Sequence, residues 1–327
     1  MANPTVCVLA LGGTIASASD GKGGVLPNLD AATLLAAVPG LDSSGVEVSA
    51  STFRSVSSAS LTLDDLAQLS DLIAAEAPRH DGIVITQGTD TLEESSFYLD
   101  LVTDPAVPLV LTGAMRNPTL AGPDGPANLL AAIQVATNEQ ARGLGALVVF
   151  NDEIHAARSV RKAHTTSTAA FVSPDAGPLG RVSENVVRLH RRLSPAPTIR
   201  PVTPTPPANV AVVTTYLGDD GGVLDAIDER YQGLVIAGLG GGHVPGPLLD
   251  RIDRLTARMP VVIASRTGAG PILRTTYSFP GSDRDLARRG LISAGSLDPY
   301  KSRVLLHLLL ASGADRATFA DTFEQLS

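Results

Sequence analysis

Cysteine is nearly absent from this sequence, since Cys7 is the only one among 327 residues. A single cysteine excludes an intramolecular disulfide and any metal site built from several thiolates. A reducing compartment agrees best with this usage, so we expect a cytoplasmic protein.

Aromatic residues are also scarce, at 4% of the chain with no tryptophan. Hydrophobic cores must therefore be built mainly from Ala, Val, Leu and Ile, the usual filling of sheets covered by helices. The length suffices for two such cores, so the composition favours an α/β protein with two domains.

The sequence has none of the segments that membrane or nucleic-acid binding would need. No stretch approaches the roughly 20 apolar residues that span a bilayer. The first apolar run, Val6 to Leu11, is too short for a secretory signal, and no basic segment precedes it. The net charge is −8, and no Lys/Arg run is interleaved with aromatics. We expect neither a membrane nor a nucleic acid as partner.

Short β-branched runs alternate with segments of helical spacing, which predicts two doubly wound α/β domains with mainly parallel sheets. A Pro-rich stretch over residues 194–208 interrupts this rhythm and predicts a linker. We expect a larger N-terminal catalytic domain over 1–193 and a smaller C-terminal domain over 209–327. The predicted strands are Thr5–Leu11, Gly82–Thr86, Val107–Leu111, Ala146–Phe150, Val210–Thr214, Gly233–Ala237 and Val261–Ser265. The predicted helices are Leu63–Ala75, Leu92–Leu101, Ala127–Thr137 and Pro299–Ala311.

Small and polar residues follow the predicted strands, where open parallel sheets bind ligands. After the first strand, Gly12 and Gly13 allow a tight turn with Thr14 at its tip. After the second comes Thr86-Gln87-Gly88-Thr89-Asp90-Thr91-Leu92-Glu93-Glu94, and after the third Thr112-Gly113-Ala114-Met115-Arg116. Each segment also has a purely structural interpretation as a strand-to-helix turn. In the second segment, the spacings of Asp90 with Glu93 and of Thr91 with Glu94 also fit a capping box.

A threonine hydroxyl needs a neighbouring base before it can act as a nucleophile. The chain has only three lysines, at 22, 162 and 301, against 22 arginines. A desolvated lysine can release a proton and an arginine cannot, which makes Lys162 a candidate; a solvated lysine is the alternative.

The six histidines show no spacing of two ligands on one helical face, and we predict no metal and no cofactor. Gly238 to His243 is glycine-rich, but it lacks the Lys and Ser/Thr of a phosphate loop, so a plain turn is favoured.

Four segments together, in this order, resemble the bacterial-type L-asparaginases, and the likeness runs over most of the chain. The segments are Gly12-Gly13-Thr14-Ile15-Ala16, Gly88-Thr89-Asp90-Thr91-Leu92-Glu93-Glu94, Gly113-Ala114-Met115-Arg116 and Asp124-Gly125-Pro126-Ala127-Asn128-Leu129. Ser293 to Pro299 is also similar. The resemblance implies hydrolysis of the side-chain amide of L-asparagine to L-aspartate and ammonia, by a homotetramer built from dimers.

By this resemblance Thr14 is the nucleophile. Thr89, Asp90 and Lys162 form the second polar group of the site, with Lys162 and Asp90 keeping Thr89 poised as a proton relay. In another version of the mechanism, Thr89 and Lys162 activate a water molecule directly.

The resemblance also implies substrate-binding positions. Ser58 would hold the α-carboxylate, Asp90 the α-ammonium, and the Ala114 carbonyl would lie near the leaving nitrogen; Gly88 belongs to the same group. His243 and Tyr277 stand in the segment that a partner subunit would contribute.

Several positions depart from the family pattern. Leu11 stands in place of a threonine, Gln87 of a histidine and Ala59 of a glutamine, and the segment 17–28 contains no tyrosine. His243 and Tyr277 stand near an expected asparagine and glutamate. A glutaminase, an ammonia-supplying amidotransferase subunit and a non-catalytic amino-acid-binding protein remain alternatives.

Overall fold

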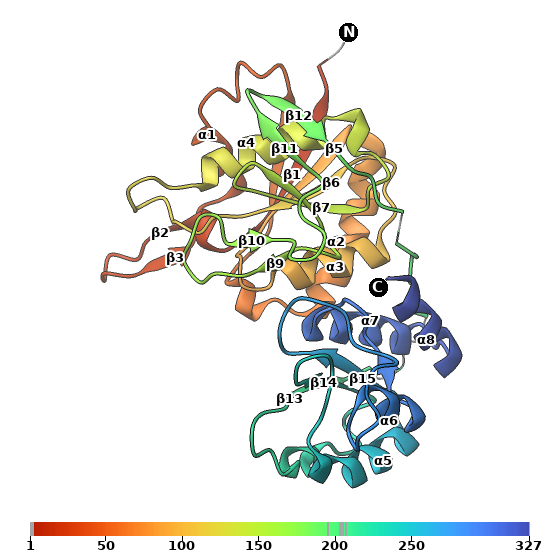
Figure 1. Cartoon of the computed structure of the whole chain (residues 1–327). Coiled ribbons are helices and arrows are strands. Elements are labelled where there is room, and N and C mark those ends of the chain that lie inside the picture. Colours follow the sequence, from red (N-terminus) through yellow and green to blue (C-terminus); the bar gives the residue numbers. More distant parts are fainter. Residues whose placement is uncertain (1–2, 195, 203–205, 207, 327) are drawn as a thin grey trace. The chain divides into compact units, whose positions relative to one another are not determined.

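The computed structural model describes residues 3–194, 196–202, 206 and 208–326, and the chain forms two compact units, Met1–Thr198 and Ile199–Ser327 (Figure 1). Each unit is built on a sheet whose central strands are parallel, so the predicted fold class is confirmed. Part of the predicted linker, residues 195, 203–205 and 207, lies outside the described residues.

The first unit contains an eight-stranded sheet in the order β12-β11-β8-β7-β6-β5-β1-β4. The strands β4, β1, β5, β6 and β7 are parallel, whereas β8, β11 and β12 continue the sheet antiparallel. The eight strands are β1 Thr5–Gly12, β4 Glu47–Val56, β5 Gly82–Thr86, β6 Leu109–Thr112, β7 Ala146–Phe150, β8 Glu153–Ala156, β11 Gly180–Ser183 and β12 Val186–Leu189.

Two short hairpins accompany this sheet, and both lie next to or contain a predicted site residue. One comes directly after Thr14 and the other contains Lys162. The hairpin strands are β2 Ser17–Ser19 with β3 Val25–Pro27, and β9 Arg161–Lys162 with β10 Phe171–Val172.

Helices cover both faces of the large sheet. The side chains of Val6, Val8 and Ala10 on β1 share a buried cluster with Leu34 and Ile133, so α1 and α4 pack on that face. The alternation of side chains along β1 turns Cys7, Leu9 and Leu11 to the opposite face, where Figure 1 shows α2 and α3. The four helices are α1 Ala31–Ala36, α2 Leu63–Glu76, α3 Leu92–Val102 and α4 Gly125–Ala136.

The second unit contains a parallel four-stranded sheet, β13-β14-β15-β16, with helices α5 to α8. Its central strands are buried along their whole length, as the apolar runs predict. The strands are β13 Val210–Thr214, β14 Gly233–Gly238, β15 Val261–Ser265 and β16 Ile292–Ser293. The helices are α5 Leu249–Arg258, α6 Asp283–Arg288, α7 Pro299–Ala311 and α8 Arg316–Gln325.

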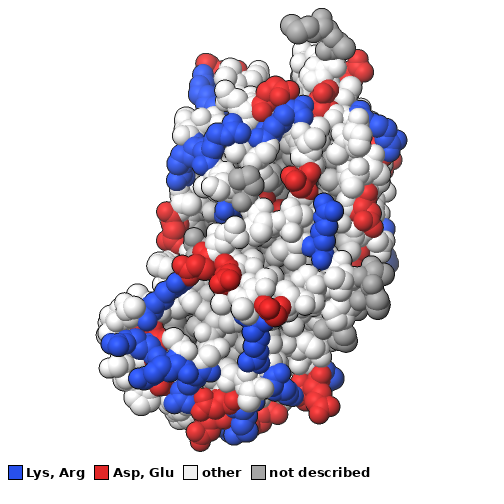
Figure 2. Space-filling view, turned by 90° about the vertical axis from the view of Figure 1, so that its right-hand side faces the viewer, with Lys and Arg blue, Asp and Glu red and all other residues white. Residues whose placement is uncertain are grey.

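Among the described residues, no helix is both long and apolar enough to cross a membrane. On the face of the molecule shown in Figure 2, basic and acidic side chains are interspersed.

Candidate active site

The turns after β1 and β5 are in direct backbone contact, which places Thr14 and Thr89 in neighbouring turns. Gly13 has a φ of 82°, and a Cβ atom on it would lie 2.2 Å from Gly88 Cα and from Gly88 N. Real Cβ atoms do not approach backbone so closely, and a side chain at this φ would itself be strained. Thr14 and Thr89 each follow one of the two touching glycines. The turn therefore requires glycine at position 13 to bring the two threonines into one site.

Two further segments pack against the β5 turn in the same way. A Cβ atom on Gly88 would lie 2.7 Å from Ser58 Oγ, and one on Gly113 would lie 2.5 Å from the Gln87 carbonyl oxygen. Ser58 and Gly113 follow β4 and β6, the outer neighbours of the β1–β5 pair. Four strand ends thus converge at the carboxyl edge of the sheet, as the ligand-binding rule for parallel sheets predicts.

Lys162 joins Thr89 and Asp90 in a compact polar cluster. Its Nζ donates to Thr89 Oγ1 at 2.8 Å and to Asp90 Oδ1 at 2.6 Å. Thr89 is buried and the Lys162 side chain is 15% exposed, whereas the Asp90 side chain is 65% exposed. The structure thus brings Lys162 to Thr89 and Asp90, which lie 73 and 72 positions before it in the sequence. The Asp90 carboxylate stays open to a ligand.

The β9–β10 hairpin holds Lys162 in place. Lys162 pairs with Phe171 across the hairpin, and its backbone N–H donates to the carboxylate of Glu93 in the first turn of α3. Lys162 is therefore held at both its backbone and its ammonium group, so the alternative of a solvated lysine does not describe it. Burial alone does not distinguish it, because Lys301 is also buried, next to Asp298 in the second unit.

Ser58 and Thr91 tie the start of α3 to the segment after β4. Ser58 Oγ accepts a hydrogen bond from the Asp90 N–H at 3.2 Å, and Thr91 Oγ1 donates to the Ser58 carbonyl at 3.0 Å. Thr91 is the N-cap of α3 but forms no side-chain cap, so the capping-box interpretation of Thr91 and Glu94 is wrong. Its hydroxyl is used to position Ser58, whose own hydroxyl proton stays available for a ligand.

The hydroxyl of Thr14 has no hydrogen-bond partner within the residues that the structure describes. Thr14 begins a single 3₁₀ turn, Thr14–Ala16, which Ser17 closes by donating from Oγ to the Gly13 carbonyl at 2.9 Å. The hairpin that follows contains no tyrosine. The phenol that many family members place against this threonine is therefore absent from the hairpin.

Asp124 and Asn128, to which the sequence pattern assigned no individual role, hold the turn after β6 in place. The Asp124 carboxylate accepts from the N–H groups of Met115 and Arg116, and Asn128 Nδ2 donates to the Gly113 carbonyl at 3.0 Å. They lie four positions apart at the start of α4, a spacing that places both on one helical face. Together they fix the turn that contains the buried Ala114.

Gln87, which replaces the usual histidine, is fully buried and faces α3. Its amide nitrogen donates to Ser95 Oγ at 2.9 Å, so it supports the helix start from beneath the turn. Of the other two positions that depart from the family pattern, Leu11 is buried and Ala59 is exposed.

His243 and Tyr277 lie in the second unit, apart in sequence but in contact with each other. Their rings meet edge to face with centroids 5.2 Å apart, and Phe279 packs on both. Tyr277 is 45% exposed, which leaves its ring available to another surface. The glycine-rich segment before His243 closes into a turn by a hydrogen bond from the Leu239 N–H to the His243 carbonyl, as the plain-turn interpretation predicts.

The fold and this cluster define a class: two-unit, doubly wound α/β proteins with hydroxyl groups and a Lys–Asp pair at the strand ends. The family model "Asparaginase, N-terminal" matches residues 5–195, and "Glutaminase/Asparaginase C-terminal domain" matches residues 209–323. The chain therefore belongs to the asparaginase family.

Named relatives extend over nearly the whole chain. A probable L-asparaginase of Deinococcus radiodurans is 40% identical, with 98% of both chains covered. A probable periplasmic L-asparaginase of Haemophilus influenzae is 33% identical over 98% of this chain and 93% of the relative. The crystal structure of a probable cytoplasmic L-asparaginase from Campylobacter jejuni superposes with a TM-score of 0.87 at 31% identity, over 98% of this chain and 99% of the other.

Proposed function

We propose that this chain hydrolyses the side-chain amide of L-asparagine to L-aspartate and ammonia, with Thr14 as the nucleophile. The observation that carries the proposal is the Lys162–Thr89–Asp90 cluster, joined to the Thr14 turn by the Gly13–Gly88 contact. The names of the full-length relatives support the same activity.

In the first step, Thr14 Oγ attacks the amide carbon, its proton passes to the leaving nitrogen, and the C–N bond breaks to release ammonia. Water then cleaves the ester on Thr14, which gives aspartate and restores the hydroxyl. In this version the Thr89 hydroxyl relays the proton between Thr14 and the Lys162 amine.

The alternative version keeps Thr14 as a ligand and uses Thr89 with Lys162 to activate water. Thr89 Oγ1 accepts a hydrogen bond from Lys162, which lowers the cost of negative charge on that oxygen. This observation favours Thr89 as a proton relay equally well, so chemical trapping must separate the two versions.

The backbone narrows the choice of oxyanion donors. The N–H groups of Met115 and Arg116 are taken by Asp124, that of Asp90 by Ser58, and that of Gly13 by the Val56 carbonyl. Within the described residues, the N–H groups of Thr14 and Thr89 have no acceptor. We assign the oxyanion to these two donors, which follow the touching glycines.

Ser58 and Asp90 suit the α-carboxylate and α-ammonium of an amino acid, because one offers a hydroxyl proton and the other an exposed carboxylate. We propose that His243 and Tyr277 complete the site from a second copy of the chain, within a homotetramer or dimer. We place the protein in the cytoplasm, as the name of the Campylobacter structure does for that protein.

Ammonia release from asparagine and from glutamine tests the proposal. We expect asparagine turnover by the unaltered chain and its loss in Thr14→Ala, with Thr318→Ala as a control because that threonine is exposed in α8. Unchanged asparagine turnover in Thr14→Ala would refute Thr14 as nucleophile. Turnover of glutamine alone would make the chain a glutaminase, and turnover of neither amide would favour an amino-acid-binding protein.

A further inference from the structure

Cys7, Glu76 and His80 bring three metal-ligating side chains together in the first unit. One ligand atom from each residue, the thiol sulfur, a carboxylate oxygen and a ring nitrogen, lies within 4.8 Å of the other two. In the part of the chain that the structure describes, no other group of three or more His, Cys, Asp or Glu residues converges this closely.

The cluster lies between the sheet and the end of α2. Cys7 on β1 is the register partner of Ser49 on the edge strand β4, so the two side chains are neighbours on one face. Glu76 is the last residue of α2, and His80 follows the single 3₁₀ turn Ala77–Arg79. Two segments therefore supply the ligand atoms: β1 contributes Cys7, and the end of α2 with the turn after it contributes Glu76 and His80.

The hydrogen bonds of His80 place its lone pair on Nε2, where a cation would displace the hydroxyl of Ser49, and the Glu76 carboxylate lies 3.6 Å from Nδ1. His80 Nδ1 lies 3.1 Å from the Glu76 carbonyl oxygen, which can only accept, so Nδ1 carries the proton. His80 Nε2 then has the lone pair and accepts from Ser49 Oγ at 3.0 Å. A backbone carbonyl that fixes the histidine tautomer in this way is typical of metal-bound histidines.

One side of the cluster is buried and the other faces solvent. Cys7 is 5% exposed, whereas the side chains of His80 and Glu76 are 14% and 20% exposed. An ion can reach the cluster from the solvent side at His80 and Glu76.

We propose that Cys7, Glu76 and His80 bind a thiophilic divalent cation of the zinc type. Thiolate, imidazole and carboxylate are all zinc ligands, and tetrahedral coordination would place their donor atoms about 3.3–3.6 Å apart, with water in the fourth position. The side chains need to approach by only about 1 Å from their present limit of 4.8 Å.

The metal would act on stability and not on amide hydrolysis. Cys7 precedes Gly12 by five residues along β1, which corresponds to about 17 Å of extended strand. A cation there would connect β1 to the end of α2 and to His80 in the turn that follows the helix. This site is therefore independent of the proposed function.

Titration of the full chain with Co²⁺, followed by competition with Zn²⁺, tests the proposal. We expect one equivalent of Co²⁺ to give a thiolate-to-metal charge-transfer band that Zn²⁺ abolishes. Cys7→Ser should remove the band, and His80→Gln should weaken Co²⁺ binding by about tenfold or more. His190→Gln is the matched control, since His190 is exposed and remote in sequence, and it should bind Co²⁺ like the unaltered chain.

Thermal unfolding provides a second measurement that does not depend on colour. Zn²⁺ should raise the midpoint of the unaltered chain and of His190→Gln, should raise that of His80→Gln by less, and should leave Cys7→Ser unchanged. His80 lies on the solvent-facing side of the cluster, so His80→Gln should leave the hydrophobic core intact. This variant remains informative if Cys7→Ser folds poorly. The absence of a charge-transfer band at saturating Co²⁺, or an unchanged affinity in His80→Gln, would overturn the site.

Discussion

The two units use the same strand-to-turn plan, but their glycine-rich turns contact different neighbours. After β1, Gly13 touches the backbone of a different turn, and a hydroxyl follows it. After β14, Gly242 packs against Ile272 and Ile263, and the turn closes on its own backbone. Glycine-rich turns that look alike in sequence therefore differ in what they touch. The residues that a glycine contacts, and not the presence of the glycine itself, distinguish the candidate active site from a plain turn.

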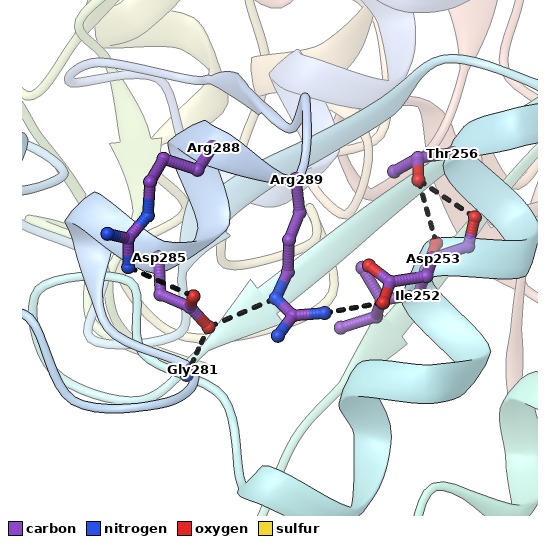
Figure 3. A network of polar contacts seen from close by, with 7 residues as sticks. All are labelled: Ile252, Asp253, Thr256, Gly281, Asp285, Arg288 and Arg289. Carbon is purple, nitrogen blue, oxygen red and sulfur yellow. Dashed lines mark hydrogen bonds and ion pairs between the residues drawn. The ribbon is translucent and has the colours of Figure 1, made fainter.

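The charged networks of the two units also differ in the groups that they contact. In the first unit Lys162 bonds a buried hydroxyl and an exposed carboxylate. In the second, Arg289 bridges Asp285 and Asp253 between α6 and α5, at partly exposed positions (Figure 3). An ion pair between exposed groups contributes little to stability. We therefore expect substitutions in the first network to change activity and those in the second to change little.

The largest effect should come from Lys162→Met. Loss of the amine removes the partner of both Thr89 and Asp90, and loss of a positioned proton carrier typically reduces turnover by about 10²–10⁴-fold. Steady-state ammonia release measures the effect. Arg188→Met is the control, because Arg188 is exposed on β12. Turnover within twofold of the unaltered chain would show that the cluster is only structural.

Gly13→Ala should cost about 3 kcal/mol in the free energy of unfolding, together with most of the activity, because its Cβ would overlap the Gly88 backbone. Gly290 in the second unit has the same φ of 82° but open space around a Cβ. Gly290→Ala should therefore cost only about 1 kcal/mol, the conformational part. Denaturant unfolding measures both variants. An equal decrease in the free energy of unfolding for both variants would mean that the contact between Gly13 and Gly88 does not restrict the residue at position 13.

A buried histidine should make the first unit sensitive to acid. Burial, with some help from Arg181, lowers the pKa of His155 to about 4, so the ring is neutral at neutral pH and its 3.4 Å approach to Glu153 is not an ion pair. A lowered folded-state pKa gives stability that is complete above pH 6.5 and is lost as the pH falls through 4.

Relative to His155→Gln, the unaltered chain should lose about 3 kcal/mol of unfolding free energy between pH 7 and pH 4. Burial raises the pKa of Asp100 to about 6, which gives a contribution of opposite slope, lost as the pH rises through 6. Asp100 is present in both proteins, so the difference between them isolates His155. A difference that does not vary with pH would contradict the assignment.

The smallest effect should come from Arg289→Met in the second unit. Its partners Asp285 and Asp253 are partly exposed, so the expected cost is below about 1 kcal/mol, with asparagine turnover unchanged. Thermal unfolding in low and high salt measures it. A loss of several kcal/mol would remove the contrast between the two networks.

The parallel strands were predictable because their apolar runs are buried on both faces. β5, β7, β13 and β15 have the predicted bounds, and α7 does as well. Strand β6 begins two residues later than predicted, at Leu109.

The edge strand β4 was missed because its sequence, EVSASTFRSV, alternates exposed and half-buried positions and has no apolar run. The antiparallel β8, β11 and β12 are four residues each, too short to stand out in the pattern.

The site was predictable in part. The strand-end rule pointed to the turns with Thr14 and Thr89. The scarcity of lysine and the family resemblance singled out Lys162, but no local pattern contains its contact with Thr89 across 73 positions. Asp124 was missed because its role is to hold backbone N–H groups of another segment. The Cys7, Glu76 and His80 cluster could not be predicted from the sequence, because only the fold brings Cys7 on β1 close to the end of α2.

The identity of the nucleophile is the central claim, and chemical trapping tests it most directly. The chain is mixed with L-asparagine, quenched in acid during turnover, digested and examined by mass spectrometry. We predict an aspartyl ester on the peptide that contains Thr14, and its absence in Thr14→Ala. An ester on Thr89 instead would contradict the account.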